Sequence, residues 1–164
     1  IKNAKGEYCI ILDADLTVKV IDLNLFHKAI ENNLADVING SRLVLRMEEG
    51  SMPYSNYMDN IFFSKLISWI TSVEISDSLC GSKCFKTEDW AKFEEYREQN
   101  NIKDLWGDFS ILFGSSYYGF KLIDIPVKYF RREHGQTKMN RRIYYFFNML
   151  GICLKNLINF KFSK

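Results

Sequence analysis

The nine residues Tyr8-Cys-Ile-Ile-Leu-Asp-Ala-Asp-Leu16 combine a short apolar run with two carboxylates that are separated by one residue. A run of this length and composition predicts a buried strand of a parallel sheet. Because side chains alternate along a strand, Asp13 and Asp15 point to the same side, where the strand ends. Ligands of open α/β sheets bind at this end, and paired carboxylates suit Mg²⁺ or Mn²⁺. An Asp pair that only caps the following turn gives the same pattern.

The composition indicates one folded domain that does not bind nucleic acid. The chain has 164 residues, of which 47% are apolar, and this is enough for a hydrophobic core. Its net charge of +2 is too small for a nucleic-acid partner. The four cysteines have no metal-binding spacing and are expected to be reduced, as in a cytoplasmic protein. Because the chain begins directly before a strand, we expect a fragment whose N-terminal strands and helices are missing.

Hydrophobic periodicity predicts alternating strands and helices along the rest of the chain. Helices are expected at residues 21–33, 54–73, 87–100 and 108–118, and strands at 36–41, 84–85 and 120–129. The last strand is expected at a sheet edge because Pro126 cannot donate to a central ladder. Residues 43–53 are predicted to form a loop over a site. This order predicts an α/β fold with a mixed, mostly parallel sheet that is flanked by helices.

The C-terminal segment, residues 140–164, is predicted to form an amphipathic helix separate from the domain at residues 1–139. Its apolar face is expected to contain Ile143, Phe146, Phe147, Leu150, Leu154, Leu157 and Ile158. Basic residues flank this helix, and Glu133 is the only acid between Lys128 and Lys164. Such a helix predicts peripheral contact with the cytoplasmic face of a membrane. Packing on the domain or on a missing partner explains the pattern as well.

Five polar segments lie at the ends of predicted elements, where loops gather above a sheet. They are residues 13–15, 40–42, 77–83, 106–108 and 131–138. Each segment has a plain alternative as a turn, a helix cap or a group of solvated charges. Their order along the chain nevertheless predicts that they build one site.

The ordered motifs resemble those of family 2 glycosyltransferases over nearly all of residues 1–139. They are Leu-Asp-Ala-Asp-Leu, Asn-Gly-Ser-Arg, Asp-Ser-Leu-Cys-Gly-Ser-Lys, Trp-Gly-Asp-Phe, Ile-Pro-Val-Lys-Tyr and Arg-Arg-Glu-His-Gly-Gln-Thr-Lys. Within that family the chain resembles the bacterial polyprenyl-phosphate and dolichyl-phosphate sugar transferases. The resemblance implies part of a GT-A (Rossmann-like) catalytic domain. The family block that holds the nucleotide base and ribose is absent, so this chain alone is expected to bind nucleotide poorly.

The implied activity is an inverting transfer of a sugar from a nucleotide-sugar donor. The implied acceptor is a polyprenyl phosphate or a glycan, in the synthesis of cell-surface polysaccharide or lipid-linked sugars. By the same resemblance, Asp13 and Asp15 hold Mg²⁺ or Mn²⁺ on the donor diphosphate. Asp77 and Asp108 are the candidates for a general base, which a hydroxyl acceptor requires. The implied substrate-binding and phosphate-binding residues are Arg42, Lys83, Arg131, Arg132, Thr137 and Lys138.

Two other functions fit the same residues. A metal-dependent nucleotidyl or phosphoryl transferase on a similar sheet also uses paired carboxylates. A non-enzymatic, membrane-peripheral binding module needs only the basic aromatic C-terminal segment, with a purely structural Asp pair.

Overall fold

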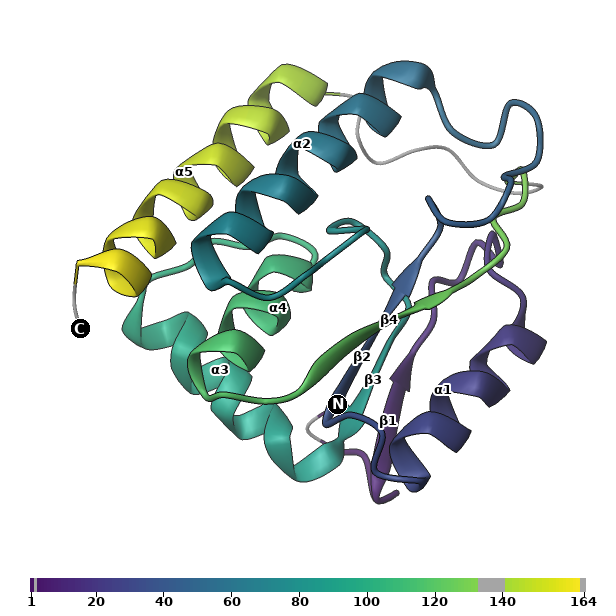
Figure 1. The fold of residues 1–164 in the computed structure, drawn as a ribbon, viewed down its shortest axis with the longest axis horizontal. Helices are drawn as coiled ribbons and strands as arrows, with labels where there is room; N and C mark the ends of the chain where they lie inside the picture. Colours follow the sequence, from purple (N-terminus) through teal and green to yellow (C-terminus); the bar gives the residue numbers. More distant parts are fainter. Residues whose placement is uncertain (2, 133–140, 163–164) are drawn as a thin grey trace.

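The computed structural model describes residues 1, 3–132 and 141–162, which form a four-stranded sheet with helices on both faces (Figure 1). The strands lie in the order β1 (Tyr8–Ile11), β3 (Lys83–Lys86), β2 (Val37–Ser41) and β4 (Leu122–Pro126). Strands β2 and β4 are parallel, and β3 is antiparallel to both β1 and β2. The predicted α/β class with a mixed sheet is confirmed.

The position of β1 differs from the prediction. Within the described residues it is an edge strand, it pairs only with the antiparallel β3, and its Ile10 is exposed. Two of the three strand pairs are therefore antiparallel, and the sheet is not mostly parallel by pairing. The reason is that β3, which is distant in sequence, lies between β1 and β2. The opposite edge agrees with the prediction, because β4 lies there and ends at Pro126.

The helices form two unequal layers (Figure 1). Helix α1 (Leu23–Glu31) follows a 3-10 turn at Val20–Asp22 and covers one face of the sheet. The other face is covered by α2 (Tyr54–Thr71), α3 (Trp90–Gln99), α4 (Asp108–Tyr117) and α5 (Arg142–Lys161), with a second 3-10 turn at Thr87–Asp89 before α3. All five predicted helices are confirmed, with ends that shift by a few residues.

The alternation of side chains along the strands divides the core into two parts. Cys84, Ile38 and Ile123 pack on the α1 side, whereas Phe85, Val37 and Leu122 pack on the side of α2 to α5. On this second side, the residues two positions along each strand from Phe85, Val37 and Leu122 have polar side chains. These residues, which are paired across β3, β2 and β4, are Lys83, Asn39 and Asp124. We call these three residues the polar row. Asn39 and Asp124 are the middle residues of β2 and β4, and Lys83 is the first residue of β3.

Helix α5 packs on the domain, and the side that it buries overlaps the predicted apolar face only in part. It lies along α2 and contacts α4. Its buried residues are Met149, Ile152, Cys153 and Asn156, of which none belongs to the predicted face. Of that face, Phe146, Leu150 and Leu157 are half-buried against the core, whereas Ile143, Phe147 and Leu154 remain exposed. Within the described residues, no helix has both the length and the apolar character needed to span a membrane.

Phe63 is the aromatic residue that joins α2 to its two neighbouring helices. It is fully buried, and its ring centroid lies 5.7 Å from that of Phe109 and 5.1 Å from that of Phe146. Because truncation leaves a cavity, we expect Phe63→Ala to lower the free energy of unfolding by about 3–5 kcal/mol, measured by urea denaturation. The matched control is Phe147→Ala, whose ring is exposed, with an expected change of less than about 0.5 kcal/mol. Equal losses in the two variants would contradict this packing.

Candidate functional site

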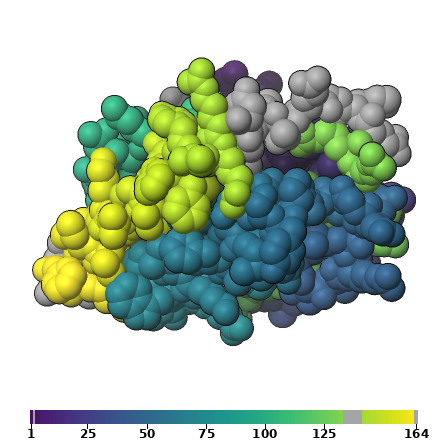
Figure 2. Space-filling view, turned by 90° about the horizontal axis from the view of Figure 1, so that it is seen from above, coloured from purple at the N-terminus to yellow at the C-terminus, as the bar shows by residue number. Residues whose placement is uncertain are grey.

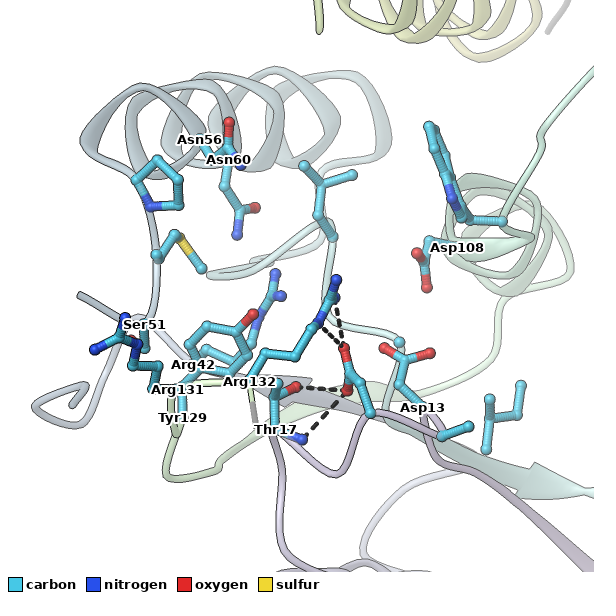
Figure 3. Close-up of a pocket in the computed structure, with 18 of the residues that line it drawn as sticks. Asp13, Thr17, Arg42, Ser51, Asn56, Asn60, Asp108, Tyr129, Arg131 and Arg132 are labelled. Atoms are coloured by element: carbon cyan, nitrogen blue, oxygen red, sulfur yellow. Dashed lines mark hydrogen bonds and ion pairs between the residues drawn. The ribbon is translucent and has the colours of Figure 1, made fainter. Parts of the chain in front are cut away.

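A cavity of about 840 Å³ opens at the carboxyl-terminal end of β1 and beside α2 and α4 (Figure 3). All five polar segments predicted from the sequence contribute to its walls. Their contributions are Asp13 and Asp15, Arg42, Leu79 and Gly81, Trp106 and Asp108, and Arg131 and Arg132. Asp77 and Lys83 do not line the cavity but are fully buried beneath it. Thr137 and Lys138 lie outside the described residues.

Asp13 and Asp15 line the same part of the cavity but have different surroundings. Oδ1 of Asp15 accepts hydrogen bonds from the backbone N and Oγ1 of Thr17, at 3.2 and 2.9 Å. Oδ2 of Asp15 accepts two from Arg132, at 2.9 Å from Nε and 2.6 Å from Nη2. Partial burial raises the pKa of Asp15, but these hydrogen bonds outweigh that effect and bring the pKa below its ordinary value. Among the described side chains, none donates a hydrogen bond to Asp13, whose carboxylate borders the cavity (Figure 3).

Two glycines allow the segment before β3 to pass close to the Asp pair. A Cβ atom on Gly81 would lie 2.4 Å from Oδ2 of Asp13, so any side chain there displaces this carboxylate. A Cβ atom on Gly40 would lie 2.9 Å from Sγ of Cys80 and 3.0 Å from the carbonyl oxygen of Ser82. The backbone N of Gly40 instead donates a hydrogen bond to that carbonyl, at 2.8 Å. Gly40 is thus required by close contact with backbone, whereas Gly81 leaves room for the Asp13 carboxylate.

Asp77 forms a buried ion pair with Arg42. Its Oδ2 lies 2.8 Å from Nε of Arg42, and its Oδ1 lies 2.9 Å from Nη2. Nδ2 of Asn60 donates to Oδ1 at 2.6 Å, and the backbone N atoms of Arg42 and Leu79 donate at 2.9 and 3.0 Å. Burial raises the pKa of Asp77, but Arg42 and the other donors more than offset it, and the pKa lies below its ordinary value.

This arrangement limits what Asp77 and Arg42 can do. A carboxylate has about four lone-pair sites, and Asp77 already accepts five hydrogen bonds, so none remains for a substrate proton. The ring of Tyr129 lies 5.1 Å from the Arg42 guanidinium. The geometry therefore argues against the base role predicted for Asp77. It assigns to Arg42 mainly a contact within the protein, with one edge at the cavity.

Lys83 and Asp108 form a second buried pair. Nζ of Lys83 lies 2.6 Å from Oδ1 of Asp108 and also donates to the carbonyl oxygen of Cys80. Asp108 lies at the start of α4 and lines the cavity. Burial raises the pKa of Asp108 to about 6, and the Lys83 ammonium offsets only part of this effect. Asp108 is therefore a carboxyl group at the cavity wall with a pKa well above the ordinary value.

The predicted loop at residues 43–53 does lie at the cavity. Gly50, Ser51, Met52 and Pro53 line it. Glu48 connects this loop to the segment after β4, because its backbone N donates to the Tyr129 carbonyl oxygen at 3.0 Å and its Oε2 accepts from the backbone N of Arg131 at 2.7 Å. The same connection places Arg131 and Arg132 at the cavity.

Several residues of the site were not predicted from the sequence. Asn56 and Asn60 are four residues apart on α2, and both line the cavity. Their signal is a pair of amides on the helix face that otherwise buries Phe63 and Ile67. Tyr129 has no such signal, since an aromatic residue near a strand is ordinary.

No family model matches this chain. No curated protein matches its sequence either.

Asp13 and Asp15 can hold a divalent cation only if a bound substrate, such as a diphosphate, supplies further oxygen ligands. Within the described residues, no group of three or more His, Cys, Asp or Glu side chains is placed to hold a metal ion. Asp13 and Asp15 supply hard carboxylate oxygens on one side of the cavity, and Mg²⁺ is often held by one or two carboxylates together with substrate phosphates and water. The two residues fit that arrangement and do not form a closed protein site.

The buried pair of Asp77 and Arg42 can be tested by stability measurements. We expect Asp77→Asn to lower the free energy of unfolding by about 3–5 kcal/mol because it leaves a buried guanidinium without its counter-charge. The control is Glu94→Gln, since Glu94 pairs at 3.0 Å with Arg97 on α3, and the Arg97 side chain is 38% exposed. Its expected loss is about 0–1 kcal/mol. Chemical denaturation of both variants decides the matter, and similar small losses would show that the buried pair does not organise the site.

Proposed function

We propose that the protein is the catalytic part of an inverting, nucleotide-sugar-dependent glycosyltransferase with a GT-A type fold. One observation carries the proposal. Asp13, Arg132 and Asp108, from three distant parts of the chain, are turned toward the same cavity, and the pKa of Asp108 is raised there (Figure 3). Its volume of about 840 Å³ falls in the range of small-molecule sites.

On the donor side, Asp13 and Asp15 are the residues that would hold Mg²⁺ or Mn²⁺ at the diphosphate of a nucleotide-sugar. A bound divalent cation supplies Lewis-acid stabilisation of the charge on a leaving diphosphate. Asp13 has a carboxylate free of described donors, whereas Asp15 shares its Oδ2 with Arg132. Arg131 and Arg132 border the same cavity and can form charge-assisted hydrogen bonds with phosphate oxygens.

On the acceptor side, Asp108 is the better-placed candidate for a general base. It lines the cavity, whereas Asp77 is buried and fully hydrogen-bonded. Lys83 holds one carboxylate oxygen of Asp108 from beneath, which fixes its orientation. A sugar hydroxyl acceptor needs such a base, and a polyprenyl phosphate, already ionised near neutral pH, does not.

The donor is tested by thermal shift of the full-length protein with UDP-, GDP- and dTDP-sugars, each with Mg²⁺, Mn²⁺ or EDTA. Because a ligand that binds the folded state raises Tm, we expect a metal-dependent rise with one nucleotide class. Asp13→Asn should abolish it. Gly81→Ala should also abolish it while keeping both carboxylates, since its methyl group takes the space of the Asp13 side chain.

Asp59→Asn is the control for these variants, because Asp59 does not line the cavity, and it should keep the full response. A folded protein that responds to none of the nucleotide-sugars would overturn the proposal. A response to nucleoside triphosphates alone would favour a nucleotidyl transferase.

The pH dependence of kcat/KM distinguishes the two acceptor classes. If Asp108 is the base for a hydroxyl acceptor, kcat/KM falls about tenfold for each pH unit below a pKa of about 6, because the protonated carboxyl cannot accept a proton. Asp108→Asn then removes both this slope and most of the rate. A polyprenyl phosphate has its own second pKa of about 6, so its slope persists in Asp108→Asn. Glu31→Gln, at an exposed carboxylate of α1 that does not line the cavity, should leave the profile unchanged.

A further inference from the structure

The outer sides of α2 and α5 carry large apolar side chains that the fold leaves exposed. They are Tyr54, Met58, Phe62 and Trp69 on α2, and Ile143, Tyr144, Phe147, Leu154 and the following Phe162 on α5, with exposures between 45% and 77%. Spacings of three, four, seven and eight residues place each set on one stripe of its helix. We call the two stripes together the α2–α5 face.

The two stripes form one continuous surface because the helices lie side by side and run in the same direction. Near their first turns, Nε of Arg142 lies 2.7 Å from Oδ2 of Asp59. Farther along, the rings of Phe62 and Phe146 stack at 5.7 Å, and near the ends Nζ of Lys161 lies 5.7 Å from the Trp69 ring centroid. Figure 2 shows the surfaces of α2 and α5 adjoining each other. A helix of the length of α2, 18 residues, extends about 27 Å, so the face is long.

The charge of this face is of one sign. Lys65 lies within the α2 stripe and Lys161 within the α5 stripe, and both are exposed. The sequence of α5 contains no acid, and the only acid of α2 is Asp59, which Arg142 neutralises. Apolar and aromatic side chains are therefore combined with positive charge that no carboxylate on these helices balances.

We propose that the α2–α5 face docks on an anionic lipid bilayer. Tyr and Trp rings suit the boundary between headgroups and acyl chains, and Lys side chains extend along an apolar surface to reach lipid phosphates. A second copy of the chain fits less well, since a two-fold interface brings each basic residue close to basic residues of the same face. The docking surface is broader than the C-terminal helix predicted from the sequence, because α2 supplies much of it.

The docked bilayer lies next to the cavity. The opposite side of α2 presents Asn56 and Asn60 to the cavity, so about one helix diameter, roughly 10 Å, separates the cavity from the face. A groove of about 480 Å³ that is lined by Val44, Leu45 and Tyr54 lies beside the first turn of α2 and shares Met52 with the cavity.

Vesicle flotation of the full-length protein tests the docking. We expect binding to vesicles of phosphatidylcholine with phosphatidylglycerol, and much less to phosphatidylcholine alone. Met58→Ser/Trp69→Ser on α2 and Phe147→Ser/Leu154→Ser on α5 should each reduce the partition coefficient by about tenfold or more, since each removes two apolar contacts. The control, Leu25→Ser/Leu34→Ser, changes two equally exposed leucines in and just after α1, on the other side of the sheet, and should bind as the wild type does.

Two further tests examine the contribution of charge and the depth of insertion. Lys65→Glu/Lys161→Glu should abolish the preference for anionic vesicles, while the matched Lys28→Glu on α1 keeps it. Brominated lipids should quench tryptophan emission in the wild type and in Trp90→Phe, but much less in Trp69→Phe, because Trp69 lies on the face and Trp90 is half-buried.

A folded wild type that does not float, or that floats equally well in all variants, would overturn the proposal. So would a stable dimer that the serine variants dissociate, since the face would then be covered by a second copy. If only the α5 variant loses binding, the α2 part is wrong. Vesicle binding is measured without nucleotide-sugar, so its failure leaves the proposed transferase activity untouched, and the reverse holds as well.

Discussion

The buried carboxylate of Asp77 is the interaction on which the cavity depends. It joins three parts of the chain: Asn60 on α2, Arg42 just after β2, and the backbone of Leu79 before β3. A charge taken out of water is tolerated only where hydrogen bonds and a counter-charge compensate it, and here both oxygens are fully occupied. The requirement fixes the distance between the end of the sheet and α2, and thus the width of the cavity between them.

The polar row extends this framework across the sheet. Nδ2 of Asn39 donates to the carbonyl oxygen of Asp77 and to Oδ1 of Asp124, both at 2.8 Å. Oδ2 of Asp124 in turn accepts from the backbone N and Oγ of Ser76. Strand β4 is thereby connected to the segment that carries Asp77.

The two buried ion pairs, Asp77 with Arg42 and Asp108 with Lys83, differ in the hydrogen bonding and the pKa of their carboxyl groups. Asp77 has all its lone pairs occupied and a lowered pKa, whereas Asp108 has one strong donor, a raised pKa and a place at the cavity wall.

The sequence was sufficient for most elements and for the segments that line the cavity, because these depend on local patterns. Periodicity predicted the helices, and polar residues at strand ends predicted which segments meet. The insertion of β3 between β1 and β2 was not predictable, since strand order depends on pairing between distant residues. The roles of Asp77 and Asp108 were not separable either, because they differ only through partners such as Asn60 and Lys83. The buried side of α5 was predicted only in part, because Met149, Ile152 and Cys153 make that helix apolar on more than one side.

Helix α2, like α5, carries apolar side chains on more than one side. A helix that is apolar all round is normally buried on all sides. The inner side of α2 meets the core through Phe63 and Ile67 and the cavity through Asn60, while its outer side presents Met58 and Trp69 to solvent. One helix therefore carries both the amide that holds Asp77 and part of the apolar face. Because these side chains project from opposite sides of the helix, a change at Trp69 alters the outer surface without removing a contact to Asp77. Membrane contact and the organisation of the cavity are thus separable, although one rigid element carries both.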